Sequence, residues 1–237
     1  MGPHRLRLLH TSDVHLTDRP TGLDTFSSVI EMALEAQVDA VLIAGDLFDH
    51  ARVPDSAIAA TVDQLRRLEQ PVVVIPGNHD CVETGSIYER ADLGAAGGHV
   101  FFVGEPQGRQ VLLERLRLAV WARGIEDHDP RHRPLAGYEP LPRDWWQVVV
   151  THGHFVPRGE SSERSSQIHQ DEIAGLGCDY VALGHWHHFF DASTDGVAAF
   201  YSGSPTDRIG GDPSVNLVTL DPDTGPDVER VPVRTPA

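Results

Sequence analysis

The chain has 237 residues, of which 40% are hydrophobic and 23% charged, a composition typical of a folded globular protein. This composition excludes disordered and collagen-like classes, and no run approaches the roughly 18 consecutive apolar residues of a membrane span. The formal net charge is −16, and all 19 basic residues are Arg. Because proteins that hold nucleic acid unaided usually carry a basic stripe, this charge argues against such a grip. Fourteen histidines beside 35 acidic residues indicate ligands for divalent metal.

The cysteine content and the N-terminus indicate a reducing compartment. Cys81 and Cys178 lie far apart and outside any C-x-x-C pattern, so we expect neither a disulfide framework nor a zinc ribbon. The first ten residues alternate Arg or His with Leu and offer no apolar signal core. We therefore expect a cytoplasmic protein. The length suits one domain, and no repeat or linker divides it, so we expect a single domain over residues 1–237.

Hydrophobic periodicity predicts a βαβ rhythm in the first half and more strands in the second. The first half contains predicted strands at 5–10, 40–44 and 72–75 and predicted helices at 23–37 and 54–69. The second half contains one short predicted helix at 168–176 and predicted strands at 100–103, 116–121, 147–151, 179–183, 197–201, 215–220 and 228–233. Segments 124–144 and 157–167 are rich in loop-forming residues and predict long loops, which are often functional.

Polar motifs follow five of these strands at their C-terminal ends, where open α/β sheets present their sites. In chain order they are Asp13-Val14-His15, Gly45-Asp46-Leu47-Phe48-Asp49, Gly77-Asn78-His79-Asp80, Thr151-His152-Gly153-His154 and Gly184-His185-Trp186-His187. Each motif alone is also typical of a turn or a helix cap. Together they would crowd carboxylates that repel one another, and a divalent cation supplies the missing partner.

The ordered set D-x-H, G-D-x-x-D, G-N-H-D, H, G-H-x-H resembles the calcineurin-like metallophosphoesterases over residues 13–187. Four segments are further similar to the SbcD-type DNA repair exonucleases: HTSDVHL (10–16), AGDLFD (44–49), DYVALGH (179–185) and YSGSP (201–205). The resemblance implies an α/β fold, a four-layer sandwich in which two mixed β-sheets are flanked by helices.

The resemblance also implies a centre with two divalent metal ions. One ion would take Asp13, His15, Asp46 and His187. The other would take Asp46, Asn78, His152 and His185, with Asp46 as the bridge. His154 is the alternative to His152, because a bulge could exchange two residues so close together. Mixed nitrogen and oxygen ligation without thiolate suits Mn²⁺, our first choice, and also Fe²⁺ or Zn²⁺.

By the same resemblance, His79 would stand beside the scissile phosphate as a non-ligand and Asp49 would steady it. Two metals can share a hydroxide that forms near neutral pH and attacks phosphorus in line. His79 could then protonate the leaving alkoxide, a contribution of roughly 10²–10⁴-fold. Asn78 and His79 are candidate substrate contacts. Arg208 is another, although a surface salt bridge explains it equally well.

We therefore expect a metal-dependent phosphoester hydrolase, and a phosphodiesterase or DNA exonuclease-like enzyme in particular. A phosphomonoesterase or protein phosphatase on the same metals is the alternative. A non-catalytic scaffold should have lost ligands or the acid, and none is missing. SbcD-type nucleases continue into a capping region and helices that bind an ATPase partner. Only about fifty residues follow His187 here and they predict strands, so we expect a nucleotide, a small diester, or a nucleic-acid end delivered by a partner.

Overall fold

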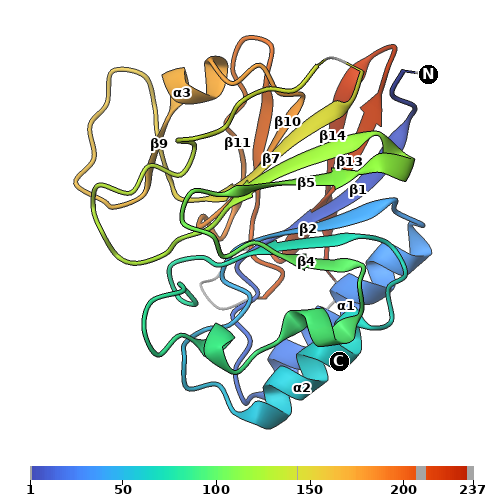
Figure 1. The fold of residues 1–237 in the computed structure, drawn as a ribbon, viewed down its shortest axis with the longest axis vertical. Helices are drawn as coiled ribbons and strands as arrows, with labels where there is room; N and C mark the ends of the chain where they lie inside the picture. Colours follow the sequence, from blue (N-terminus) through green and yellow to red (C-terminus); the bar gives the residue numbers. More distant parts are fainter. Residues whose placement is uncertain (1, 143, 207–211, 234–237) are drawn as a thin grey trace.

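The computed structural model describes residues 2–142, 144–206 and 212–233, so Arg208 lies outside the described residues. Two six-stranded β-sheets pack face to face, and helices lie on the outside. Figure 1 shows α1 (Pro20–Glu35) and α2 (Asp55–Leu65) below the sheets and α3 (Gln170–Ala174) above them. The four-layer α/β arrangement expected from the resemblance is confirmed.

The first sheet has the strand order β14-β13-β1-β2-β3-β4. Its strands are β1 (Leu6–Thr11), β2 (Ala40–Ala44), β3 (Val72–Ile75), β4 (Val100–Phe102), β13 (Ser214–Asp221) and β14 (Gly225–Pro232). Strands β1 to β4 are parallel, whereas β13 and β14 are antiparallel to their neighbours. Since β1, β2 and β3 run in one direction, the loops that follow them meet at one edge of the sheet.

The second sheet has the strand order β11-β12-β10-β7-β6-β5. Its strands are β5 (Arg109–Leu113), β6 (Leu118–Arg123), β7 (Trp146–His152), β10 (Tyr180–Gly184), β11 (Phe189–Asp191) and β12 (Ala198–Ser202). The four central strands β6, β7, β10 and β12 are parallel. A separate two-stranded sheet pairs β8 (His154–Val156) with β9 (Gln167–His169) and lies with α3 on the outer face.

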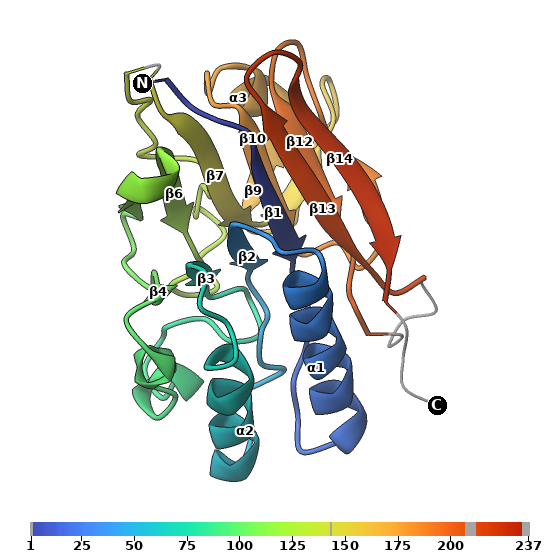
Figure 2. The ribbon, with the colours of Figure 1, turned by 90° about the vertical axis from the view of Figure 1, so that its right-hand side faces the viewer.

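The core forms because the central strands bury both of their faces. On β2, Val41 and Ile43 pack with the apolar residues of α1 and α2, whereas Leu42 and Ala44 pack against the second sheet. A strand covered on both sides has no polar face, and this explains its uninterrupted apolar sequence. Figure 2 shows α1 and α2 next to each other below the strands of the first sheet. No helix in the described part of the chain has the length and apolar character of a bilayer span.

The predicted elements of the first half are all present, with ends that differ by a few residues. The helix predicted at 168–176 is shorter than expected, because Gln167–His169 forms β9 and pairs with β8 before α3 begins. Strands β5, β8, β9 and β11 were not predicted. Three of these have only three residues, too few for an alternating pattern to be recognised.

Candidate metal centre

The polar motifs of both sheets meet at one place, where strands β1, β2, β3, β7 and β10 end. Backbone hydrogen bonds fix the loops: the N–H groups of Asp13 and His15 donate to the carbonyls of Gly45 and Asp46, each at 3.0 Å. The two sheets approach closely here, because a Cβ atom on Gly184 would collide with the carbonyl oxygen of Ala44. The structure thus brings the five predicted motifs together.

The backbone is strained at several of these positions. Asp13, His15 and Asp46 have φ angles of 54°, 52° and 52°, and His185 has a φ of 109°. Non-glycine residues rarely adopt positive φ, and such conformations persist only where the surrounding structure enforces them. Strain of this kind clusters at functional sites. The loops therefore hold their side chains in one arrangement at a cost in backbone energy.

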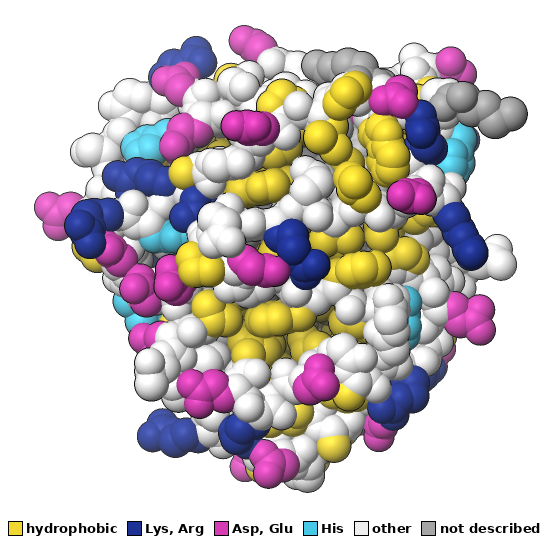
Figure 3. Space-filling model, viewed as in Figure 1, with side chains coloured by type: hydrophobic (Ala, Val, Ile, Leu, Met, Phe, Trp, Pro, Cys, Tyr) yellow, Lys and Arg dark blue, Asp and Glu magenta, His cyan; other side chains and the backbone are white. Residues whose placement is uncertain are grey.

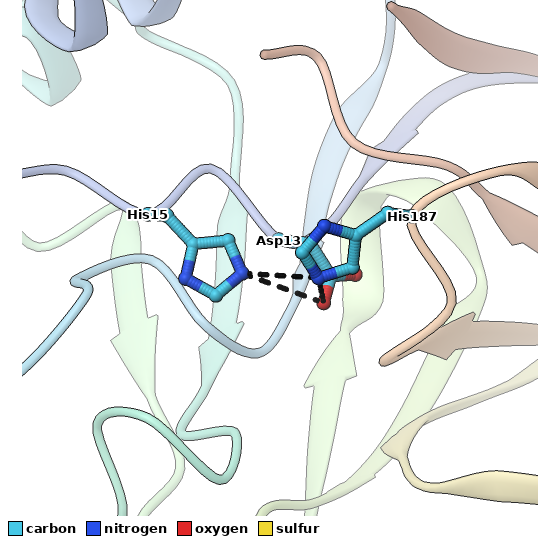
Figure 4. A group of neighbouring side chains, drawn as sticks. All are labelled: Asp13, His15 and His187. Atoms are coloured by element: carbon cyan, nitrogen blue, oxygen red, sulfur yellow. Dashed lines mark hydrogen bonds and ion pairs between the residues drawn. The ribbon is translucent and has the colours of Figure 1, made fainter. Parts of the chain in front are cut away.

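One group of side chains combines Asp13, His15 and His187 (Figure 4). The Nε2 atoms of His15 and His187 lie 3.3 Å apart, and Asp13 Oδ1 lies 3.6 Å from His187 Nε2 and 4.0 Å from His15 Nε2. Asp13 is fully buried, and within the described residues its Oδ1 atom accepts no hydrogen bond. Two ligands of one ion lie about 2.8–4.4 Å apart, depending on the angle between them, when each bond is about 2.0–2.2 Å long. The group therefore fits a divalent cation.

A second group combines Asp46, Asn78, His152 and His185. Asn78 Oδ1 lies 3.0 Å from His152 Nε2 and 2.9 Å from His185 Nδ1. The Nδ1–H of His152 donates to the carbonyl of Ala44 at 2.8 Å, and burial lowers the pKa of this imidazole, so its Nε2 carries a lone pair. That lone pair faces the amide oxygen of Asn78. Two acceptors turned toward each other suit a cation between them.

Asp46 lies between the two groups. Its Oδ2 atom is 3.8 Å from His15 Nε2 and 3.6 Å from His152 Nε2, and its Oδ1 atom accepts a hydrogen bond from the backbone N–H of His79 at 2.8 Å. Burial, and then the negative charge of Asp13, raise the pKa of Asp46 well above its usual range. A positive charge at this position would offset both effects. The donor set and its electrostatics therefore fit two cations that share Asp46.

His79 and Asp49 are arranged differently from the expectation. The Nδ1–H of His79 donates to the backbone carbonyl of Asp49 at 3.0 Å, whereas the Asp49 carboxylate is 3.7 Å from that nitrogen. The carboxylate lies closer to His15, with 3.1 Å between Oδ1 and His15 Nδ1. The rings of His15 and His79 meet edge to face, with centroids 4.6 Å apart. The Asp49 carboxylate lies beside the His15 ring of this pair. Asp49 holds His79 mainly through its backbone.

His152, rather than His154, belongs to these groups. The His154 imidazole is half-buried and its Nδ1 accepts a hydrogen bond from the indole N–H of Trp186 at 3.2 Å. Burial, and then the positive charge of Arg164, lower the pKa of His154. This histidine therefore contacts the edge of the centre and lies in neither group of close donor atoms.

The sequence reasoning assigned no role to Asp80, which the structure places under the centre. Its buried carboxylate accepts hydrogen bonds from the N–H of Gly77 (2.6 Å), the N–H of Phe48 (3.1 Å) and the hydroxyl of Tyr88 (2.7 Å). These bonds tie the loop after β2 to the loop after β3. An acidic residue at the end of G-N-H-D was visible in the sequence, but nothing in its spacing showed that it turns inward.

Residues 6–189 match the family model described as calcineurin-like phosphoesterase. The chain belongs to this family. The assignment supports a metal-dependent phosphoester hydrolase, and the Asp and His groups agree with the dimetal centre of calcineurin-like phosphoesterases. Among curated relatives, the DNA double-strand break repair protein Mre11 of Haloferax volcanii is 31% identical over an alignment 246 residues long. The alignment covers 92% of this chain and 50% of the relative.

Other similarities agree with the family. The uncharacterized metallophosphoesterase YhaO of Bacillus subtilis is 26% identical over 86% of this chain and 54% of its own. The crystal structure of TT1561 from Thermus thermophilus has a TM-score of 0.65 at 14% identity, over 97% of this chain and 99% of that chain. A novel archaeal phosphodiesterase has a TM-score of 0.56 at 18% identity, over 96% and 99%. These structures share the fold. The chain spans about half the length of the two curated relatives.

Burial favours the neutral imidazole at His15 and His185 of this phosphoesterase. It lowers the pKa of His15 to about 4 and that of His185 to about 3, and neutral imidazole is the form that binds metal. Burial also lowers the pKa of His10 to about 3, although His10 is not in either group. The Nδ1 of His10 shares a hydrogen bond of 2.8 Å with the hydroxyl of Tyr180.

We expect His10 to make the stability of the metal-free protein depend on pH. Its folded-state pKa of about 3 lies below the ordinary value of 6.5, so the unfolded state binds more protons between these values. The stabilisation is present above pH 6.5 and is lost as the pH falls. From pH 7 to pH 5 the loss is about 2 kcal/mol. Urea denaturation in a chelator should show that the H10Q variant loses about 2 kcal/mol less than the wild type over this interval. An equal loss in both proteins would contradict the assignment.

Proposed function

We propose that this calcineurin-like phosphoesterase is a phosphodiesterase that acts on nucleotides or nucleic-acid ends with two divalent metal ions. The proposal depends above all on the contact between His152 Nε2 and Asn78 Oδ1, 3.0 Å apart, while His152 Nδ1 donates to Ala44. Both atoms are acceptors when the imidazole is neutral. Such a pair is unfavourable in a protein interior unless a positive charge lies between its members.

The proposed ligands follow from the two groups of donor atoms. The first ion would be held by Asp13, His15, Asp46 and His187, and the second by Asp46, Asn78, His152 and His185. This mixed set of nitrogen and oxygen donors suits Mn²⁺ first and also Fe²⁺ or Zn²⁺. When bound, two divalent ions supply an activated water nucleophile and offset the charge that gathers on the phosphoryl oxygens.

His79 is proposed as the general acid. Its side chain is 45% exposed beside the centre, so a substrate can reach it. Because the Asp49 carbonyl accepts the Nδ1–H of His79, Nε2 is the nitrogen left to exchange a proton with the leaving oxygen. The carboxylate of Asp49 is proposed to orient His15 from the side opposite the metal.

The substrate class is proposed from the relatives and the charge. Mre11 is by name a DNA double-strand break repair protein, which favours a phosphodiester of nucleic acid for this chain as well. The net charge is −16, and on the face shown in Figure 3 acidic and basic side chains of the described residues are interspersed without a continuous basic band. We therefore propose that a partner, of the ATPase kind the resemblance implies, holds any long DNA.

A comparison of aryl phosphates tests the substrate class. With Mn²⁺, the purified protein should hydrolyse bis-para-nitrophenyl phosphate with a higher kcat/KM than para-nitrophenyl phosphate. Both compounds offer His79 the same leaving group. The diester has in addition a second ester group, which extends along the site. A higher kcat/KM for the monoester would favour the phosphomonoesterase alternative, and no hydrolysis of either compound would refute the proposal.

Metal content tests the ligand assignment. We expect D46N to bind less Mn²⁺ and to lose turnover together, because one substitution removes a ligand of both ions. H152A should also lose bound metal, whereas H154A should retain it, since His154 lies outside both groups. The measurement is metal content by mass spectrometry after dialysis against Mn²⁺. Two ions retained in D46N, or metal loss confined to H154A, would show that the assignment is wrong.

The role of His79 is separable from metal binding. H79Q should keep both ions and lose roughly 10²–10⁴-fold in kcat, the range that general acid catalysis contributes. The loss should be smaller for para-nitrophenolate than for an alkoxide leaving group, because the phenolate needs less protonation. Paired measurements of kcat and metal content decide the point: a metal-depleted H79Q protein would make His79 a ligand.

A further inference from the structure

A cavity of about 220 Å³ opens beside the proposed second metal position. Its lining includes Asn78 and His185 together with Arg164, His128, Ser165 and Ser166. No Asp or Glu is found among the described residues that line it, although the chain has 35 acidic residues and 19 basic ones. A wall of this composition favours an anion over a cation.

Arg164 supplies the permanent positive charge of this cavity. In the described part of the chain, no carboxylate forms an ion pair with its guanidinium, whereas Arg158 of the same loop pairs with Asp171 at 2.7 Å. His128, unlike Arg164, lies beside a carboxylate. One of its ring nitrogens is within 4.8 Å of the thiol of Cys81 and of a carboxylate oxygen of Glu83. Arg164 is thus available to an external anion.

The loop that carries Arg164 is held by its own hydrogen bonds. The side-chain amide of Gln167 donates to the carbonyls of Ser162 (2.6 Å) and Arg164 (2.8 Å), and the N–H of Arg164 donates to Ser162 Oγ (3.2 Å). Gln167 belongs to β9, which pairs with β8 directly after His152. The backbone of Arg164 is therefore fixed relative to the strand that ends in a proposed metal ligand.

We infer that this cavity binds a second, non-scissile phosphate of the substrate, one sugar away from the phosphorus that is attacked. A guanidinium binds phosphate through two parallel hydrogen bonds, and two seryl hydroxyls can add further donors. The volume is below the roughly 300–1,000 Å³ of pockets for drug-sized ligands, so it suits a phosphate with part of its sugar. His79 contacts the His15 end of the centre and the cavity borders the Asn78 end. The leaving group therefore meets His79 and the retained nucleotide extends toward Arg164.

This inference rests on the proposed function and narrows it. The preferred substrate would be an oligonucleotide end or another nucleotide with two phosphates, since a simple monoester cannot reach both the metals and Arg164.

Matched thymidine substrates test the cavity. Thymidine 5′-para-nitrophenyl phosphate and its 3′-phosphorylated form share one leaving group and differ by one phosphate, and the 3′-aryl ester with or without a 5′-phosphate covers the opposite polarity. We expect the second phosphate to raise kcat/KM in one polarity by about 10- to 100-fold, the range of a hydrogen-bonded charge. R164Q should abolish this preference, and R158Q should retain it. An equal kcat/KM for both members of each pair, or an intact preference in R164Q, would overturn the inference.

Binding separates this inference from the proposed function. Calorimetry on the metal-loaded protein should show that thymidine 3′,5′-bisphosphate binds more tightly than thymidine 5′-monophosphate and that R164Q removes the difference. A protein that hydrolyses none of the esters yet shows this Arg164-dependent difference would refute the proposed function and support the cavity. Hydrolysis without any such difference would do the reverse.

Discussion

Acceptor atoms that face one another, from the buried His152 and the partly buried Asn78, are the constraint on which the rest of this structure depends. The oxygen of Asn78 faces the lone pair of His152, and Asp46 has a pKa raised by burial and by the neighbouring Asp13. Away from bulk water these arrangements are unfavourable, because two acceptors face each other and a buried carboxylate lies beside a second one. A positive charge reverses their sign. Positive φ angles, which also cost energy, occur in the same centre, at Asp13, His15, Asp46 and His185. Both costs concentrate where two cations would offset them.

The two sheets contribute different chemistry to this centre. Asp13, Asp46 and Asn78 follow strands of the first sheet. In the second sheet, His152 is the last residue of β7 and His185 follows β10. Neither sheet alone has the complete set of proposed ligands, so the proposed centre would form only when the sheets pack at their C-terminal edges. Gly184 permits that packing, since any side chain there would strike Ala44. The inter-sheet core is therefore a condition for the proposed metal binding, which would depend on packing far from the ligands.

The sequence predicted the central strands and the five motifs, because a strand buried on both faces is an uninterrupted apolar run and its C-terminal end is then defined. It missed the three-residue strands, whose pairing depends on distant partners such as His154 with Gln167. It predicted that Asp49 steadies His79; in the structure the backbone carbonyl of Asp49 makes this contact, and the Asp49 carboxylate lies closer to His15. The packing of the His15 and His79 rings decides which of them the Asp49 carboxylate reaches. The spacing of these residues in the sequence does not encode that packing. The single domain and the individual ligand roles stay predictions.

Local charge, rather than the net charge of −16, governs what this centre can bind. Four aspartates lie in or against it: Asp13, Asp46, Asp49 and Asp80. Two divalent ions would bring four positive charges, so the loaded centre would be close to neutral. A scissile phosphate would then find stabilisation at the ions but little long-range attraction. Arg164, unpaired within the described residues and in a wall free of carboxylates, tips this balance toward positive at the Asn78 end. An acidic protein can therefore select a substrate with two phosphates, because metal neutralises the acid of the centre and the Arg164 guanidinium stands beside it.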